Sequence, residues 1–355
     1  MPDAEQSRLH DAGLANWWLP ADCGGPGLSM EASVDIVSEL AYADAGTAFT
    51  RFISILPSTM VALYGSAQLR QDVLRPLVQD GGHCATLASE HDAGSELLRT
   101  ATVATRSGGD LVLTGEKSFS TNAEFADYLV VIATGPDDGS YLAAVVPRHT
   151  PGVHVVKRWD LVGLRSCGTY QISLRDCRVP AGNALHGNGL RILEVGLNTS
   201  RLLVASSAVG MARRIRNLCM DYAAEKQVKG AALAAHPVFA AKLGQMETTI
   251  CAMLSQCRAA ARDYDRLAAS PDPGAALLRV GSLKSVLVAK MFCGQAGRQI
   301  ADIGSQMFGG LGYTNEHPIG KIIQDMAYAS LVEGGDDVLR ELMYARHVVP
   351  PGQRA

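Results

Sequence analysis

The sequence has few aromatic residues and little charge. Among its 355 residues, 6% are Phe, Trp or Tyr and 19% are charged, and the formal net charge is −3. A nearly neutral chain lacks the basic surface that attracts nucleic acid or an anionic membrane. Its 47% of apolar residues provide material for large cores and are atypical of disorder. We therefore expect a folded protein of two or three domains with no nucleic-acid partner.

Long apolar runs and paired cysteines are also missing. No apolar run reaches the length of about 18 residues that a membrane-spanning helix needs, and the first residues lack the basic and apolar regions of a secretory signal. The eight cysteines include no Cys-x-x-Cys pair, and Cys251 and Cys257 would lie on different faces of one helix. This pattern argues against a disulfide framework or a metal site. We expect a cytoplasmic protein with reduced thiols, no metal and no membrane insertion.

Several common catalytic motifs are absent. The chain has no Gly-x-Gly-x-x-Gly fingerprint, no Walker-type phosphate loop and no His-Glu-x-x-His. It also has no Gly-x-Ser-x-Gly elbow, since Arg165-Ser166-Cys167-Gly168 lacks the first glycine. Nicotinamide binding by that fingerprint, phosphate-loop binding, and hydrolysis by serine or zinc are therefore not supported.

Helical spacing of apolar residues marks the first and last thirds of the chain. The first third predicts helices over Met30–Ala43, around Thr47–Tyr64 with an interruption at Pro57, and over Ala67–Val78. Three long proline-free stretches after residue 180 predict a bundle of long helices. Pro271-Asp272-Pro273-Gly274 predicts the turn that joins two of them.

Short β-branched runs separated by turn signals fill residues 100–179. No helix-length segment lies between these runs, so the sheet is expected to be antiparallel, in a small barrel or sandwich. The fold class is therefore α+β with several domains. We place a short N-terminal helical domain at 1–83, a middle β domain at 84–185 and a C-terminal four-helix bundle at 186–355.

Four separate segments are rich in Gly, Ser, Thr and acidic residues. They are Ser89–Glu96, Gly115–Asn122, Gln306–Tyr313 and Val332–Asp337. Each alone is typical of a loop. Together and in this order they resemble the acyl-CoA dehydrogenase family of flavoproteins. The resemblance runs from Leu19-Pro20-Ala21-Asp22-Cys23-Gly24-Gly25 to the final helix, and includes Arg178-Val179-Pro180, Tyr222-Ala223 and Asp325.

The resemblance implies a fold, a cofactor and partners. FAD would lie between the β domain and the bundle, with its adenosine end completed by a neighbouring subunit of a homodimer or homotetramer. The reaction would be α,β-dehydrogenation of an acyl thioester of coenzyme A or of an acyl carrier protein. An electron-accepting flavoprotein or another acceptor would then reoxidise the FAD.

This reaction needs a base for the α-proton and an acceptor for the β-hydride, and no amino-acid side chain accepts hydride. A carboxylate in an apolar pocket suits the base, because desolvation raises its pKa toward neutrality. Glu333 follows the apolar Ala329–Val332 and precedes two glycines. On its own it is an acidic residue favoured before a helix. The resemblance makes it the base, with flavin N5 as the hydride acceptor.

The resemblance also assigns the remaining site residues. The expected FAD contacts are Ser89, Gly94, Ser95, Phe119, Ser120, Thr121, Lys226, His236, Gln306, Gly309, Gly310, Gly335 and Asp337. The expected substrate contacts are Ser95, Asn198, Arg201 and Gly334. Lys226, His236 and the segment around Gln306 belong to the adenosine end of the cofactor.

Departures from the family pattern keep other functions open. Lys226 stands where the family has Arg, which loses a bidentate contact to pyrophosphate. Lys229 replaces an aromatic residue, and Gly335 replaces Thr. One alternative is a degenerate, flavin-free subunit that pairs with an active homologue. Another is an oxygen-using oxidase or flavin monooxygenase, although a hydroxylase would not need Glu333. Family members whose nucleotide contacts diverge in this way resemble specialised biosynthetic enzymes that act on carrier-bound acyl groups.

Overall fold

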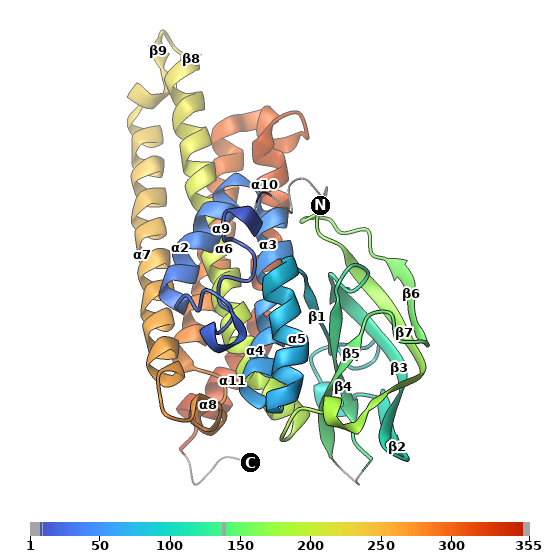
Figure 1. Ribbon diagram of the computed structural model, residues 1–355. Helices are drawn as coiled ribbons and strands as arrows, with labels where there is room; N and C mark the ends of the chain where they lie inside the picture. The colour runs from blue at the N-terminus through green and yellow to red at the C-terminus, as the bar shows by residue number, and fades with distance from the viewer. Residues whose placement is uncertain (1–7, 9, 137–139, 351–355) are drawn as a thin grey trace.

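The computed structural model describes residues 8, 10–136 and 140–350, which form a helical body with a β-sheet domain packed on its side (Figure 1). Helices come first along the chain, the sheet follows, and long helices complete it. This order of three regions confirms the predicted fold.

The N-terminal helices begin where short polar side chains cap them. Ser29 and Asp44 each accept a hydrogen bond from a backbone N–H in the first turn that follows. The predicted helix over Met30–Ala43 is confirmed, but the expected interruption at Pro57 is wrong. The chain breaks instead at Ile53 and Ser54. Pro57 lies in a first turn, where its missing N–H leaves no helical hydrogen bond unmade. The elements are η1 (Ala21–Cys23), α2 (Met30–Ala43), α3 (Ala45–Phe52), α4 (Ile55–Tyr64) and α5 (Ala67–Asp80).

Among the described residues, the stretch Ala45–Tyr64 is long and apolar enough to cross a membrane, judged by its length and composition alone. In the structure it is two helices, α3 and α4, and 72% of its most apolar window is buried inside the protein. Both helices pack on the central helix α6 (Gly189–Glu225), so their apolar residues belong to the core.

The middle region is a curved sheet in the order β1-β4-β2-β3-β7-β6, with β5 paired to β4. Most pairs are antiparallel, but β1 and β2 each pair with β4 in parallel, so the expectation of a purely antiparallel sheet is wrong. The segment between β1 and β4 contains the β2–β3 hairpin, which provides the crossover without an α-helix. The strands are β1 (Cys84–Leu87), β2 (Val103–Ser107), β3 (Asp110–Thr121), β4 (Tyr128–Thr134), β5 (Tyr141–Pro147), β6 (Val153–Arg158) and β7 (Thr169–Pro180).

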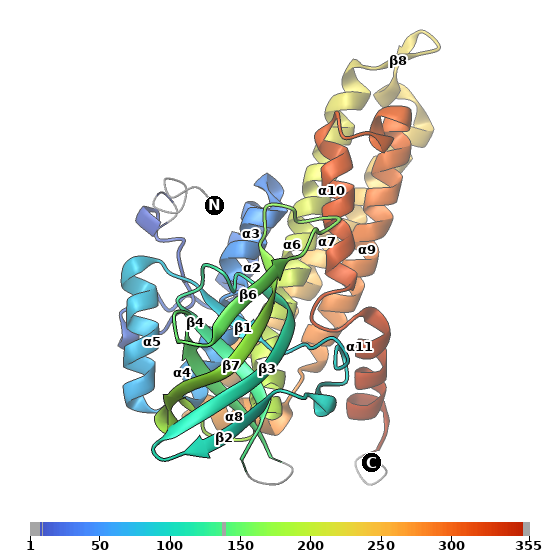
Figure 2. The same ribbon diagram turned by 90° about the vertical axis from the view of Figure 1, so that its right-hand side faces the viewer.

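The C-terminal helices α6, α7, α9 and α10 run side by side as a four-helix bundle (Figure 2). The predicted turn at residues 271–274 is correct only in its first half. Asp272 accepts a hydrogen bond from the Ala275 N–H at 2.9 Å and caps a short helix that begins at Pro273. The remaining elements are η2 (Leu97–Arg99), η3 (Ala181–Asn183), β8 (Gln227–Val228), β9 (Ala231–Ala232), η4 (Leu233–Ala235), α7 (Pro237–Ala268), α8 (Pro273–Val280), α9 (Lys284–Phe308), η5 (Gly309–Tyr313), α10 (Pro318–Met326), η6 (Ala327–Ser330), α11 (Asp336–Met343) and η7 (Tyr344–Val348).

Helix α6 is the centre of the fold, because α2, α4, α7 and α9 all pack on it. Gly210 lets α2 approach closely: a Cβ atom there would lie 2.1 Å from the Ser38 carbonyl oxygen and 2.9 Å from the Tyr42 nitrogen. Both are backbone atoms, which have no rotamer to relieve a clash. The contact between α2 and α6 therefore requires glycine at this position.

We predict that Gly210→Ala lowers the free energy of unfolding by about 2–3 kcal/mol, because the two helices must move apart. Gly244→Ala is the matched control: this exposed glycine of α7 has nothing within 4 Å of an added Cβ. The control is expected to stabilise the protein by less than about 1 kcal/mol. Urea unfolding of both variants checks this, and equal effects would contradict the close-approach argument.

Candidate active site

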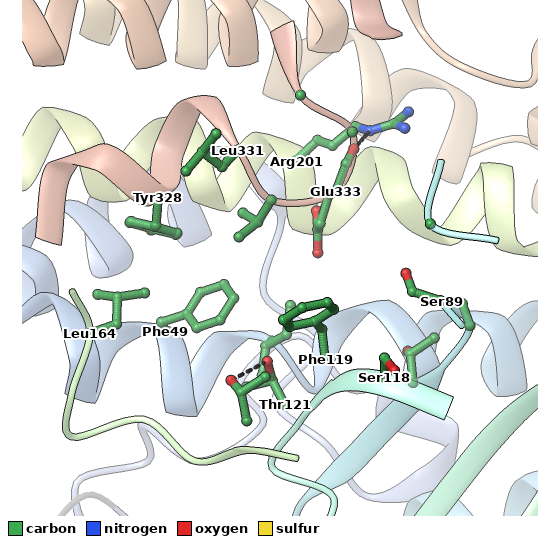
Figure 3. Close-up of a pocket in the computed structure, with 18 of the residues that line it drawn as sticks. Phe49, Ser89, Ser118, Phe119, Thr121, Leu164, Arg201, Tyr328, Leu331 and Glu333 are labelled. Carbon is green, nitrogen blue, oxygen red and sulfur yellow. Dashed lines mark hydrogen bonds between the residues drawn. The ribbon is translucent and has the colours of Figure 1, made fainter. Parts of the chain in front are cut away.

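A cavity of about 650 Å³ lies where the sheet meets the helical regions. Its walls come from α3 and α4, the end of β1 and the loop after it, β3, the loop at residues 161–169, α6, and the segment from residue 324 to 338. Figure 3 shows Glu333 pointing into this cavity from one side, while Ser89, Phe119 and Thr121 face it from the other. Side chains that are distant in sequence thus meet at one site.

Glu333 is the acidic residue of the cavity wall. Both of its carboxylate oxygens are inaccessible to solvent and have no hydrogen-bond partner among the described residues. Burial raises the pKa of Glu333 to about 7, and the Ser200 hydroxyl, Arg201 and Lys290 only partly oppose this shift. The side chain can therefore take up and release a proton near neutral pH.

Two buried cations hold the turn that carries Glu333. Its φ angle of 56° lies in the left-handed region, which is unusual for a glutamate, and Gly334 follows with a φ of 94°. Arg201 Nε donates a hydrogen bond to the Glu333 carbonyl oxygen at 2.9 Å, and Lys290 Nζ donates one to the Gly334 carbonyl oxygen at 2.7 Å. The turn is thus fixed from α6 and from α9.

The opposite wall presents an aromatic ring and hydroxyl groups. Phe119 is 58% exposed and stacks on Trp159, with ring centroids 4.7 Å apart. Thr121 Oγ1 lies 3.1 Å from Thr169 Oγ1, and Ser89 lines the same side. An open aromatic face beside hydroxyls and the backbone of Gly94 suits a flat heteroaromatic ligand with polar edges.

A buried ion pair that sequence reasoning missed supports this wall. Lys117 Nζ lies 2.7 Å from Glu90 Oε1 and also donates to the Ala88 carbonyl oxygen at 3.0 Å. Burial alone would raise the pKa of Glu90, but hydrogen bonds from Lys117, Thr100, Thr102 and the Ala101 N–H hold it at about 2. The Glu90 carboxylate therefore stays ionised and fixes the loop that carries Ser89.

The structure brings together part of the predicted set. The predicted residues that line the cavity are Ser89, Gly94, Ser95, Phe119, Thr121, Arg201, Glu333, Gly334 and Gly335. Ser120 does not line it, because this side chain lies inside the protein, where it is 1% exposed. Asp337 also lies outside the lining, on the exposed face of α11, where it pairs with Arg340. A direct cofactor contact from either side chain is not supported.

The predicted substrate contact of Asn198 is not supported either. This side chain is fully buried outside the cavity lining. Its amide nitrogen donates to the Gly281 carbonyl oxygen at 2.9 Å, and its oxygen accepts from the Leu283 N–H at 2.8 Å. Asn198 therefore joins α6 to the start of α9, and its polar atoms are occupied by that role.

The residues predicted for the adenosine end belong to the end of the bundle where β8 and β9 lie (Figure 1), and none of them lines the cavity. Lys226 follows the last residue of α6, and His236 precedes the first residue of α7 with its Nε2 3.0 Å from the Val228 carbonyl oxygen. Gln306 lies in the last turn of α9, Gly309 and Gly310 follow in η5, and the Gln306 side chain accepts a hydrogen bond from Lys242 at 3.2 Å. Their contact with the FAD of a partner subunit stays a prediction.

Sequence reasoning missed Lys290, although a signal was present. Lys290 is a lone charge among helically spaced apolar residues of α9, from Val286 to Cys293, and it is 0% exposed. A single cation on an apolar helix face indicates either a surface position or a buried partner.

Among the described residues, no group of three or more His, Cys, Asp and Glu side chains could hold a metal ion.

Comparison with known proteins agrees with the fold. Three family models match the chain: the N-terminal domain of acyl-CoA dehydrogenases over residues 1–80, the middle domain over 85–177 and the C-terminal domain over 187–348. The chain belongs to the acyl-CoA dehydrogenase family, whose members are FAD-dependent oxidoreductases.

Similar proteins are known by sequence and by structure. The chain is 28% identical over 338 residues to a mitochondrial isobutyryl-CoA dehydrogenase of Dictyostelium discoideum, covering 93% of this chain and 78% of that protein. It is 28% identical over 348 residues to cyclohexane-1-carbonyl-CoA dehydrogenase of Geobacter metallireducens, covering 97% and 88%. Butyryl-CoA dehydrogenase from Megasphaera elsdenii superposes with a TM-score of 0.88 at 25% identity, covering 97% of this chain and 89% of that one.

The buried carboxyl of Glu333 makes stability depend on pH. Its pKa is about 7 in the folded protein and close to the ordinary glutamate value of 4.5 in the unfolded chain, so the folded state binds more protons between these values. Stability is therefore lost as the pH rises from 4.5 to 7.

We predict that Glu333→Gln matches the wild type in the free energy of unfolding near pH 4.5. Above pH 7 the variant should be about 3 kcal/mol more stable. Urea unfolding of flavin-free protein checks this, and a pH-independent difference would contradict it.

Proposed function

We propose that this protein catalyses FAD-dependent α,β-dehydrogenation of an acyl thioester, with Glu333 as the base. The observation that carries the proposal is the unpartnered Glu333 carboxylate, which faces the open ring of Phe119 across the cavity (Figure 3). A base and an aromatic binding surface on opposite walls leave room between them for a substrate. This is the arrangement that removal of a proton and a hydride from adjacent carbons requires.

Glu333 would accept the α-proton. Its carboxyl has a pKa of about 7, so it is a stronger base than an ordinary glutamate and is still substantially ionised at neutral pH. Arg201 and Lys290 hold its backbone and leave its carboxylate oxygens free. The surrounding apolar side chains exclude water from the proton transfer.

The residues on the opposite wall fit FAD. Phe119 offers its exposed ring to a flavin, Ser89 and Thr121 offer hydroxyls to polar ring edges, and Gly94 and Ser95 lie where the backbone can approach a phosphate chain. When bound, FAD supplies the acceptor for the hydride from the β-carbon. The ion pair of Glu90 with Lys117 keeps this wall in place.

The cavity favours an uncharged acyl group. Ile53, Leu56, Leu193, Leu197 and Leu331 line it, and these side chains offer no polar partner to a substituted chain. The guanidinium of Arg201 is held by the Glu333 carbonyl oxygen and by Ser282 at 3.4 Å. The relatives' names specify isobutyryl, cyclohexane-1-carbonyl and butyryl groups, which are all compact and apolar. We infer that this protein also takes a compact aliphatic acyl thioester.

The test is anaerobic mixing of the flavin-loaded protein with a panel of thioesters. Butyryl, isobutyryl and cyclohexanecarbonyl groups, each on coenzyme A and on an acyl carrier protein, are compared with glutaryl-CoA. Bleaching of the visible flavin band by an apolar member supports the proposal, and the better carrier is read from the rates. Peroxide formation in air would indicate an oxidase. Failure to bind FAD would favour a degenerate partner subunit.

Loss of the base should leave cofactor binding intact. We predict that Glu333→Gln keeps its flavin but reduces the rate of flavin bleaching by at least about 10³-fold, since the amide cannot accept the α-proton. Glu341→Gln, an exposed carboxyl on α11, is the matched control and should behave as wild type. Stopped-flow absorbance gives both rates. Equal rates in Glu333→Gln and wild type would remove Glu333 from the mechanism.

We further infer that two copies of the chain complete each other's FAD sites in a homodimer or homotetramer, and that the electrons leave to an electron-accepting flavoprotein or another acceptor. The support is that Lys226, His236 and Gln306 belong to the end of the bundle near β8 and β9, and that none of them lines the cavity of its own chain. A cofactor contact by these residues therefore needs a second subunit.

We predict that Lys226→Ala weakens FAD binding about tenfold, because one charged contact to pyrophosphate is lost. Lys284→Ala, which removes an exposed charge at the start of α9, should bind FAD as wild type does. Titration of flavin-free protein with FAD, combined with sedimentation equilibrium, measures affinity and assembly together. Unchanged affinity in Lys226→Ala would contradict the role of this end of the bundle.

A further inference from the structure

A buried ammonium group lies directly beneath the turn that carries Glu333. Lys290 projects from α9, is 0% exposed, and donates to the Gly334 carbonyl oxygen at 2.7 Å. Its carboxylate neighbour, Asp336 Oδ1, is 3.9 Å away, and the other oxygen of Asp336 accepts a hydrogen bond from Gln295 at 3.2 Å. A buried cation with no close counter-ion is costly, and Met would fill a similar volume without a charge. The volume of the side chain therefore does not explain the lysine.

Glycines on the same face of α9 bring Lys290 to this position. A Cβ at Gly294 would lie 3.0 Å from the Ala329 carbonyl oxygen, and one at Gly297 would lie 2.6 Å from the Met326 sulfur. Positions 290, 294 and 297 follow one another at helical spacing, so they share a face. This close approach of α9 to the end of α10 and to η6 places the ammonium group against the backbone that leads into the base.

We propose that Lys290 is the positioning residue of the base: its ammonium group anchors the Glu333–Gly334 turn, and its charge stabilises the ionised carboxylate. The inference rests on the proposed role of Glu333. Two cations hold this turn from different helices, because Arg201 binds the carbonyl oxygen of residue 333 and Lys290 that of residue 334. The left-handed φ of Glu333 is thereby maintained.

The charge of Lys290 acts together with several other groups around the carboxylate. Ser200 and Arg201 face it from α6, with Glu194 near Arg201, and Asp336 stands at the start of α11. Tyr328 on η6 faces it as well, with its hydroxyl engaged by Ser207. Burial lowers the pKa of Lys290 to about 8, against the influence of Asp336 and Glu333. The lysine is therefore charged over the range in which Glu333 titrates.

The experiment removes the charge and follows the titration of Glu333. In Lys290→Met the pKa of Glu333 should rise by about one unit, since an opposite charge nearby is lost. The acid limb of the flavin-bleaching rate should move up by the same amount. The rate at pH 6 should then fall about tenfold, and the deficit should shrink as the pH rises toward and above 8, where the Glu333 carboxyl ionises in both proteins. Lys284→Met makes the same change at an exposed site of α9 and should leave both profiles unchanged.

A second readout does not depend on activity. Infrared spectra of protein labelled with ¹³C-glutamate report the protonated carboxyl of Glu333, assigned by its loss in Glu333→Gln. A raised titration in Lys290→Met, together with no bleaching of wild type by any thioester, would uphold the inference about the pair while the proposed dehydrogenase failed. Lys290→Gln is the second variant if the methionine variant loses its native circular dichroism. Bleaching by wild type with an unmoved Glu333 titration, or loss of the fold in both variants, would overturn the role of Lys290.

Discussion

The structure depends on one constraint: a carboxylate must be buried without a hydrogen-bond partner and still be able to ionise. An isolated charge in an apolar interior is strongly unfavourable, and such a group normally stays protonated. Glu333 is neither an unstabilised buried charge nor a permanently protonated acid, because cations lie beside its backbone and not against its carboxylate oxygens. The glycines around it serve this arrangement. Gly334 allows the turn, and Gly294 and Gly297 allow α9 to reach it.

The two sides of the cavity use the same backbone device. Phe119 and Glu333 both have left-handed φ angles, of 54° and 56°, in positions where such angles are uncommon. On β3, the register with β7 shifts between Lys117 and Ser120, and this irregularity turns the Phe119 ring out of the sheet toward the cavity. On the other side, two buried cations maintain the conformation. Regular strand or helix geometry would have directed both side chains elsewhere.

Two kinds of feature could be predicted from the sequence: helices and strands that follow from local residue patterns, and site residues that follow from the resemblance to a known family. Periodicity located the helix over Met30–Ala43 and the change to strands, and ordered motifs located Glu333, Ser89 and Phe119. The sequence did not predict the parallel pairing of β1 with β4, because that register is set by segments some forty residues apart. Asn198 matched a motif, but only the packed structure shows that Gly281 and Leu283 engage its amide. The role of Lys290 was not predicted for the same reason. Its hydrogen-bond partner is a backbone carbonyl oxygen, which cannot be recognised from residue types.

The protein buries two glutamates near lysines, Glu90 and Glu333, and the two carboxyls titrate differently. The residue types alone therefore do not decide whether a buried carboxyl can exchange a proton. Glu90 receives hydrogen bonds from Lys117, two threonines and two backbone N–H groups, and its pKa falls to about 2. Glu333 has Lys290 and Arg201 nearby, but both donate to the backbone, and its pKa rises to about 7. A fully satisfied carboxylate is permanently ionised and only holds structure together. A carboxylate whose cations act at a distance remains free to exchange a proton, which is the property that general-base catalysis needs.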